Sequence, residues 1–414
     1  MALPGVYTKA EQKMLESWEA VEQENIGWLG DDPVPGKIEL PVSQRVVTKD
    51  AILYRANCMG DSNPLWRDEN YARQTRWGGI IAPPSFACSI TYQGPVSLRM
   101  IPLEVGYAVP WDRGMPSRTY SAMWGFLGCW EYFKPIHVGD SFRVWCGPNT
   151  HEDVTGKDGK GPRSFRIDDQ LRFYNQKSEL VAIFHKRQLF KIISPEEASL
   201  IKMKSNLGEY RYSKEELEYL ENMRNNEIIR GAEIRWWEDV KLGEELQPVA
   251  KGPINAWDQV KAIISSESPR RERVQTLKPQ FSGKAVQGVD PETGVWHYPL
   301  EAHLSDKLAQ LAGFPQPIAF MYIWIDSLNR VVTNWMGNDG FLKRAEWKRF
   351  DDMFLGDAAI ARGKVVRKYV KDDGEHVVDL SCWLEDIRGY IVNGGLATVG
   401  LLSKESLLED LQRY

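Results

Sequence analysis

Residues 130–140 read WEYFKPIHVGD, and residues 347–357 read WKRFDDMFLGD. Trp, Phe, Gly and Asp occupy the same places in both stretches, and every matching pair is separated by 217 positions. Four coincidences at a single spacing indicate a duplicated unit. Each stretch is followed by alternating or β-branched runs with turn signals such as Asp373-Gly374 and Arg388-Gly389. This pattern is typical of antiparallel hairpins, so we expect two related α+β domains in tandem.

A second match lies upstream of the first. The stretch 67–84, RDENYARQTRWGGIIAPP, aligns with 304–321, LSDKLAQLAGFPQPIAFM, at a spacing of 237 positions. Because this spacing exceeds the other by 20, the first copy is expected to carry an insertion at about residues 94–120. Helical sequence precedes strand sequence in each copy. Residues 318–336 are apolar nearly all round, which is typical of a helix buried inside a curved sheet.

Helix-start signals mark the segments outside the two copies. Ser194-Pro195-Glu196-Glu197 and Ser213-Lys214-Glu215-Glu216 both have the capping-box pattern, as does the stretch that begins at Thr8. We predict an N-terminal helical extension at 1–29, a first domain at 30–193, a helical connector at 194–230 and a second domain at 231–414.

The composition excludes several classes of protein. A chain of 414 residues with 43% apolar and 26% charged residues exceeds one ordinary core and is typical of soluble proteins. Neither a membrane-spanning run nor a secretory signal is readable, so a cytoplasmic protein is expected. The net charge of −5 disfavours a nucleic-acid binder. Five scattered cysteines without metal-ligand spacing predict buried thiols and no metal.

The most specific motif is Gly-Asp-Ser-Asn-Pro-Leu-Trp at residues 60–66, followed by Ala72 and then by GGIIAPPSF. It resembles the signature of the MaoC-like, R-specific enoyl-CoA hydratases. That signature is Gly-Asp-x-Asn-Pro-[Leu/Ile]-His, an alanine six residues later, and a turn ending in His-Gly that opens the central helix. The resemblance implies a double hot-dog, in which each of two antiparallel sheets wraps around a central helix.

The same resemblance implies a lyase of fatty acid metabolism, a hydratase or dehydratase that acts on an acyl-CoA thioester. CoA would enter as part of the substrate, and no separate cofactor is expected. The chain would work either as a homo-oligomer or with a related hot-dog subunit. Two alternatives stay open: a non-catalytic acyl-CoA-binding subunit of a heteromeric dehydratase, and a thioesterase, because hot-dog folds host that chemistry too.

Hydration of an enoyl thioester explains why the motif needs these residue types. A base must take a proton from water, and an acid must give one to the α-carbon. The thioester oxygen becomes enolate-like, so backbone N–H groups at a helix N-terminus stabilise it. The resemblance assigns catalysis to Asp61 and a supporting role to Asn63. In the alternative interpretation both side chains only bond the backbone of a local turn.

The first copy departs from the family pattern at two points. Trp66 stands where the family has its histidine, and an indole cannot shuttle a proton. Pro83 and Pro84 replace His-Gly, and proline has no N–H to offer an oxyanion. We therefore expect this copy to be impaired as a site of its own, with Trp66, Ile81 and Ala82 left to bind the substrate.

The second copy keeps a histidine, because His303 stands 237 positions after Trp66. Phe320 and Met321 replace His-Gly but retain their amides. His303 is therefore a candidate catalytic residue, and Phe320 and Met321 are candidates for substrate binding. The alternative is that His303 only packs on apolar neighbours at the start of a helix.

The family carboxylate is absent from the second copy, since the same spacing places Tyr298 opposite Asp61. About thirty extra residues, 265–294, are expected to take the place of its loop. Glu301 could supply the missing carboxylate if the backbone is extended, because positions two apart then share a face with His303. His297 and Tyr298 are further candidates for substrate binding on this loop. Neither copy has the complete family dyad.

Overall fold

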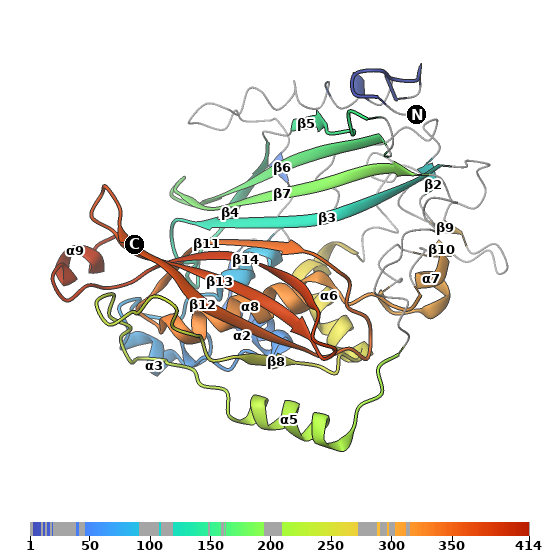
Figure 1. Cartoon of the computed structure of the whole chain (residues 1–414). Helices are drawn as coiled ribbons and strands as arrows, with labels where there is room; N and C mark the ends of the chain where they lie inside the picture. Colours follow the sequence, from blue (N-terminus) through green and yellow to red (C-terminus); the bar gives the residue numbers. More distant parts are fainter. Residues whose placement is uncertain are drawn as a thin grey trace.

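Ten strands form one continuous antiparallel path in the order β1-β4-β6-β7-β3-β11-β14-β13-β12-β8 (Figure 1). The strands of the first copy are β1 (Glu39–Leu40), β3 (Thr119–Tyr132), β4 (Phe142–Cys146), β6 (Arg163–Asn175) and β7 (Leu180–Ile193). Those of the second copy are β8 (Val249–Lys251), β11 (Phe341–Arg349), β12 (Ala359–Val370), β13 (His376–Asp386) and β14 (Ile391–Gly400). Two short strands add to the first copy: β2 (Tyr107–Ala108) pairs with β3, and β5 (Thr150–Asp153) pairs with β6.

The chain is seen here in a computed structural model. It describes residues 3–9, 11–12, 15–16, 19, 39–40, 46–90, 107–108, 119–147, 150–158, 161, 163–193, 209–271, 288–289, 296–297, 303–311 and 315–413. None of the helices in these ranges is long and apolar enough to cross a membrane.

The second half of the path repeats the first half in reverse. Each copy runs from a short edge strand through three further strands to the strand that joins the copies, and β3 pairs antiparallel with β11 at this join. Ala345 lies opposite Trp130 in that pairing. The predicted α+β double hot-dog is therefore confirmed.

Equivalent backbone contacts confirm both sequence spacings. Ile81 forms a bridge with His137 in the first copy, and Ile318 forms one with Phe354 in the second. These bridges relate residues that are 237 and 217 positions apart. Asp140, in the turn before β4, accepts from the backbone N–H of His137. Asp357, in the turn before β12, accepts from that of Phe354 in the same way. The distances are 2.8 Å for Asp140 and 2.9 Å for its counterpart.

The central helix of the second copy is α8 (Met321–Met336), which packs against β11 to β14. Fourteen of its residues are buried, which explains why the sequence is apolar on every side. The helix begins three residues later than predicted, because Ile318 instead bridges to Phe354. In the first copy the structure describes a 3-10 segment, η2 (Pro84–Ser89), at the corresponding place. Most of the predicted insertion at 94–120 lies outside the described residues.

A further pair of helices precedes the central helices: α2 (Lys49–Met59) and α6 (Ala256–Arg271). Thr48 caps the first by accepting from the N–H of Ala51, and Asn255 accepts in the same way from Asp258. The two caps are 207 positions apart, whereas Trp66 and His303, farther along the chain, are 237 positions apart. The 30 extra residues of the second copy therefore fall between Asn255 and His303, and the stretch predicted for them, 265–294, begins within α6.

Smaller helices complete the fold: η1 (Pro64–Trp66), α3 (Glu69–Arg73), α5 (Lys214–Asn225), α7 (Asp306–Leu311) and α9 (Leu407–Leu411). A separate hairpin pairs β9 (Gly288–Val289) with β10 (Trp296–His297). The capping box at Ser213 is present at the start of α5, which packs on β8. Thr8 and Glu11 exchange the same two bonds. Ser194 lies outside the described residues, and the domain boundaries stay predictions.

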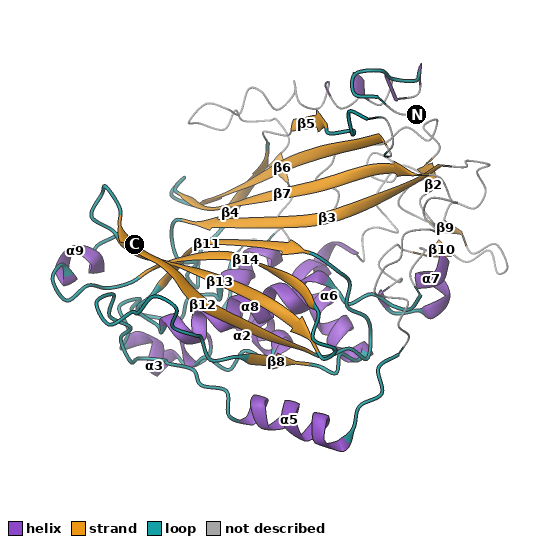
Figure 2. Ribbon diagram, in the orientation of Figure 1, coloured by secondary structure: helices purple, strands orange, loops and turns teal. Residues whose placement is uncertain are grey.

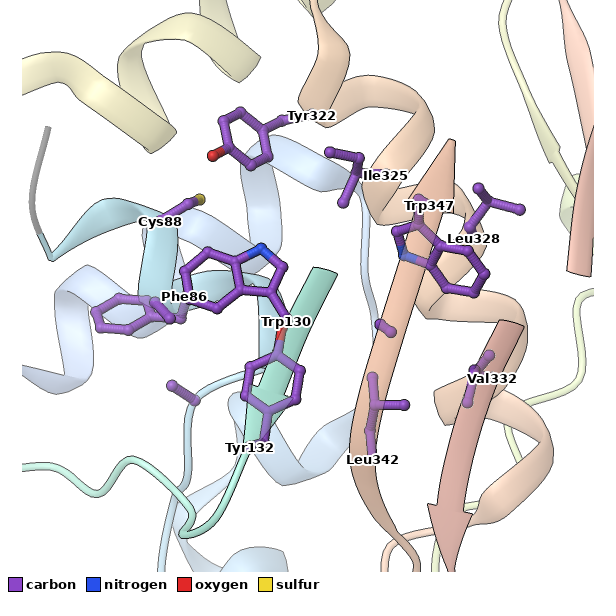
Figure 3. Close-up of a cluster of buried hydrophobic side chains, with 14 of the residues drawn as sticks. Phe86, Cys88, Trp130, Tyr132, Tyr322, Ile325, Leu328, Val332, Leu342 and Trp347 are labelled. Carbon is purple, nitrogen blue, oxygen red and sulfur yellow. The ribbon is translucent and has the colours of Figure 1, made fainter. Parts of the chain in front are cut away.

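Side chains from both copies meet in one core. The strands β3 and β11 lie side by side (Figure 2). They carry the equivalent tryptophans: Trp130 lies near Phe86 and Tyr132, and Trp347 lies near Leu328 on α8 (Figure 3). The predicted buried thiols are confirmed for four cysteines, which are free and buried: Cys58, Cys88, Cys129 and Cys382.

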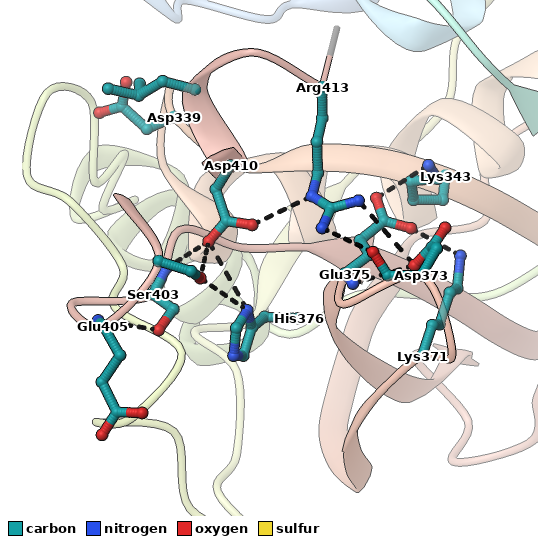
Figure 4. Close-up of polar contacts among 12 residues, drawn as sticks. Asp339, Lys343, Lys371, Asp373, Glu375, His376, Ser403, Glu405, Asp410 and Arg413 are labelled. Carbon is teal, nitrogen blue, oxygen red and sulfur yellow. Dashed lines mark hydrogen bonds and ion pairs between the residues drawn. The ribbon is translucent and has the colours of Figure 1, made fainter. Parts of the chain in front are cut away.

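The C-terminal segment is fastened to both copies. Asp410 accepts from the backbone N–H of Ser403 at 2.9 Å, and His376 lies 3.6 Å from the same carboxylate (Figure 4). From the first copy, Arg76 donates to the carbonyl oxygens of Asp339 and Asp410. The tail therefore helps to hold the segment around Arg76 against the second copy.

A close approach of two strands gives a first testable prediction. A Cβ atom added to Gly395 on β14 would come within 1.9 Å of the carbonyl oxygen of Glu346 on β11. We expect Gly395→Ala to lower the free energy of unfolding by about 1–3 kcal/mol, because the strands must move apart. Gly79→Ala is the control, since nothing lies within 4 Å of its added atom. Urea denaturation measures the stability of both variants. Equal midpoints for Gly395→Ala and Gly79→Ala would contradict the packing described.

Candidate active site

The signature motif forms a tight loop at the end of α2. Gly60 ends the helix in the left-handed conformation, with φ of 72°. Asp61 follows and is 8% exposed. Its Oδ1 accepts from the backbone N–H of Asn63 at 3.0 Å, and its Oδ2 accepts from Nε1 of Trp66 at 3.1 Å. Asp61 thus makes the local turn bond of the alternative interpretation, and it also bonds the residue that replaces the family histidine.

Asn63 connects this loop to the second copy. Its Oδ1 accepts from the N–H of Leu65 at 3.0 Å, and its Nδ2 donates to Oδ1 of Asn338 at 3.2 Å. Asn338 follows α8 and also donates to the hydroxyl of Tyr71 at 2.8 Å. Trp77 donates from Nε1 to the Asn338 carbonyl oxygen at 2.7 Å. Three residues of the first copy therefore hold the loop between α8 and β11.

An apolar hollow lies between this loop and the second copy. It is partly open to solvent. The candidates Trp66, Ile81 and Ala82 line it. The rest of the lining is formed by Asn63, Leu65, Trp77, Pro83, Pro84, Tyr132, Lys134, Pro135, Ile136, Thr333, Met336, Gly337, Asn338, Gly340, Phe341 and Leu342.

A polar hollow adjoins the apolar one. The two hollows share Pro83, Pro84 and Thr333. Asp61 belongs to the polar hollow. Its other lining residues are Arg55, Ala56, Met59, Ser85, Asp326, Ser327, Asn329 and Arg330. The two hollows therefore meet at the turn that opens the first copy's central segment.

A buried ion pair forms one wall of the polar hollow. Arg55 of α2 donates from Nη2 to Oδ2 of Asp326 on α8 at 2.7 Å, and the side chains are 1% and 7% exposed. Nη1 of Arg55 also donates to the hydroxyl of Ser265 at 2.8 Å. Burial raises the pKa of the Asp326 carboxyl, and the charge of Arg55 opposes this effect. Burial also raises the pKa of nearby Cys88 to about 12, so this thiol stays protonated at neutral pH.

The candidate histidine of the second copy, His303, lies at the turn that corresponds to Pro83 and Pro84. His303 contacts the carbonyl oxygen of Ile318 through Nδ1 at 2.7 Å, and its ring lies edge-on to Phe320. Gln259 donates to the carbonyl oxygens of both His303 and Ile318 and accepts from the N–H of Phe320. Neither hollow is lined by His303. Within the described part of the chain, His303 and Asp61 therefore do not line the same hollow.

The remaining candidates are placed less fully. Phe320 and Met321 lie at the start of α8, as expected, and α8 has no side-chain cap. Glu301 and Tyr298 lie outside the described residues. The backbone of His297 pairs with Gly288 in the hairpin of β9 and β10, and its side chain is outside the described part.

Sequence reasoning missed the residues that form the far wall of the polar hollow. Asp326 carried a signal, because it is the one acidic residue in the apolar stretch 318–336. A charged side chain is rarely buried unless it has a partner. Arg55 and Asn338 carried no comparable signal, since neither belongs to a motif.

Comparisons with known proteins agree with this architecture. The family model described as "FAS1-like, dehydratase domain region" matches residues 39–184, a range that contains the signature loop. No curated protein matches the chain significantly.

Among solved structures, a protein described as a MaoC-like dehydratase is 15% identical and has a TM-score of 0.54, with 87% of this chain and 95% of that chain covered. The chain is a double hot-dog protein of MaoC-like fold. Two further solved structures have lower TM-scores. A MaoC domain protein from Chloroflexus aurantiacus is 12% identical over 90% of this chain and 96% of its own, with a TM-score of 0.48. A Mycobacterium tuberculosis protein described as having a double hot-dog fold is 11% identical over 87% and 94%, with a TM-score of 0.47.

The predicted resemblance to MaoC-like proteins is therefore confirmed. The family model adds that the first copy is similar to a dehydratase region. The reaction, the substrate and the residues that act on it stay predictions.

Proposed function

We propose that the chain adds water to an enoyl-CoA thioester, or removes it from a 3-hydroxyacyl-CoA, at the joined hollows of the first copy. The observation that carries the proposal is that an apolar and a polar hollow meet at Pro83 and Pro84. An acyl chain needs apolar walls, and the reacting carbons need proton donors and acceptors. The similarity of this copy to a dehydratase region supports the same reaction.

In this proposal Asp61 faces the reacting end of the substrate. Both of its oxygens accept hydrogen bonds from N–H groups, at 3.0 and 3.1 Å. A carboxylate oxygen can accept a second bond, so Asp61 still has room to bind water. Asn63 keeps the loop against the second copy, while Trp66, Ile81 and Ala82 form apolar walls. CoA enters as part of the substrate.

His303 is the alternative proton acceptor. A carbonyl oxygen only accepts, so the contact with Ile318 places a proton on Nδ1 of His303. In the neutral ring Nε2 is then the acceptor. Phe320 and Met321 would contact a substrate at this second turn, together with His297, Tyr298 and Glu301 on the preceding segment.

Hydration is tested with trans-2-enoyl-CoA thioesters from crotonyl-CoA to decenoyl-CoA, by the loss of the conjugated double bond and the gain of one water in mass. We expect Asp61→Asn to lower kcat by about 100-fold or more, because the carboxylate that orients the attacking water is lost. Its thermal stability should fall only slightly, as one hydrogen bond contributes about 1 kcal/mol. Asp68→Asn, at the cap of α3 in the same copy, is the control.

Unchanged turnover in Asp61→Asn would remove Asp61 from the reaction. If His303→Ala then abolished turnover, the second copy would hold the active site. These two variants therefore distinguish an active site at the turn of the first copy from one at the turn of the second.

One observation favours a second function, a non-catalytic acyl-CoA-binding subunit. Trp66 cannot transfer a proton, and its indole already bonds Asp61. Binding of crotonyl-CoA without turnover until a related hot-dog chain is added would support this function. Release of free CoA from a saturated acyl-CoA would instead indicate a thioesterase.

A further inference from the structure

Asp326 lies on the central helix of the second copy but lines the polar hollow of the first. It shares that hollow with Asp61, which comes from the other copy. The two carboxyls are close enough for the charge of Asp61 to raise the pKa of Asp326. Two carboxyl groups from different elements therefore converge where the two hollows meet.

The two oxygens of Asp326 have different surroundings. Oδ2 accepts from Nη2 of Arg55 at 2.7 Å, whereas Oδ1 is buried and has no hydrogen-bond partner within the described part of the chain. Nε of Arg55 is likewise unpartnered there. Buried polar atoms are nearly always hydrogen-bonded, so an unused carboxylate oxygen beside a hollow can bond a group in that hollow, such as the reacting water.

The charges around Asp326 suit a group that gains and loses a proton. Burial raises its pKa, while the charge of Arg55 lowers it. A proton acceptor works best when its pKa lies near the working pH. The titratable or charged groups that influence it, or that it influences, are Arg55, Asp61, Cys88, Tyr132, Lys251 and Tyr322.

We propose that Asp326 is a catalytic residue that transfers the proton in this reaction, in place of the histidine that Trp66 replaces. As the oxygen of water bonds to the β-carbon of the enoyl thioester, a proton of that water passes to Oδ1 of Asp326. The π electrons of the double bond move toward the thioester carbonyl. Oδ1 then returns the proton to the α-carbon, so the product is the substrate plus one water. Arg55 keeps the carboxyl in place throughout.

This inference rests on the proposed function, and Asp326→Asn tests it with crotonyl-CoA. The amide keeps the shape of the side chain but cannot accept the proton. We expect kcat to fall about 100-fold or more while KM changes less than about threefold, because the group acts in the transition state. The wild-type rate of hydration should decrease as the pH is lowered through the pKa of Asp326, since a protonated carboxyl cannot accept a proton from water. That acid limb should be lost in Asp326→Asn.

The matched control is Asp357→Asn, because Asp357 is also buried and paired with an arginine, Arg388, at 2.8 Å. It lies outside both hollows, so its turnover should stay within about threefold of wild type. If Asp326→Asn does not fold, Asp326→Glu retains the charge that Arg55 needs. It should lose at least about tenfold in kcat and keep the acid limb, because its oxygen is displaced by one methylene.

The outcomes separate the two proposals. An active wild type with a folded Asp326→Asn or Asp326→Glu of unchanged kcat would overturn the role of Asp326 and leave the function standing. A wild type without turnover on any of the enoyl-CoA thioesters would remove the proposed function and this inference together. If the Asp326 variants lose kcat and Asp357→Asn does not, the proposed function and the role of Asp326 are both supported.

Discussion

Replacing Arg55 alone by methionine is expected to lower the free energy of unfolding by about 3–5 kcal/mol, because it leaves the carboxylate of Asp326 buried without its counter-charge. The side chains are 1% and 7% exposed, so water cannot replace the lost partner well. The pair also joins α2 of the first copy to α8 of the second. Urea denaturation followed by circular dichroism measures the change.

Two controls separate burial from charge. The double variant Arg55→Met with Asp326→Leu should return to within about 1 kcal/mol of wild type, since apolar pairs often replace buried ion pairs without loss. Arg187→Met breaks the exposed pair with Asp168 and should cost less than about 1 kcal/mol. If Arg55→Met proved as stable as Arg187→Met, the buried pair would not hold the copies together.

Trp347→Ala is expected to lower the free energy of unfolding by about 3–5 kcal/mol, because it removes a large buried ring between β11 and α8. The ring is 1% exposed, and its Nε1 donates to Oδ1 of Asn329 at 2.9 Å. Trp347→Phe tests the hydrogen bond separately. It should cost about 1–3 kcal/mol, since Asn329 is then left with an unpaired buried oxygen. Both values come from urea denaturation.

The equivalent tryptophan of the first copy provides the comparison. Trp130 stacks on Tyr132 and on Phe184, with ring centroids 5.8 and 4.6 Å apart. Trp130→Ala should therefore cost as much as Trp347→Ala, whereas Trp130→Phe keeps a stacking ring and should cost less than Trp347→Phe. Equal losses for the two phenylalanine variants would show that the bond to Asn329 adds no stability.

The duplication could be read from the sequence because the repeated residues have the same task in both copies. Trp130 and Trp347 fill the core on adjacent strands, and Asp140 and Asp357 close equivalent turns. Such requirements are local, so they leave a pattern at a constant spacing. The start of α8 was misplaced because Ile318, although apolar like the helix, pairs with a distant strand segment.

The polar hollow could be predicted only in part. The motif located Asp61 and Asn63, because turn and capping bonds join neighbours in the chain. Arg55 and Asp326 are 271 positions apart, and Asn63 and Asn338 are 275 apart. No local pattern relates residues at such distances, since their contact depends on how the two copies pack. The catalytic assignment of Asp61 and His303 stays a prediction.

The join between β3 and β11 has a consequence for how this protein changes over evolution. When two identical subunits associate, every substitution is made in both, and a loss on one side is a loss on the other. Here one polypeptide holds both sides, so each position mutates alone. Trp66 stands in one copy where the other has His303, and α8 of the second copy lines a hollow beside the first. Division of labour between the two sides follows from their covalent connection.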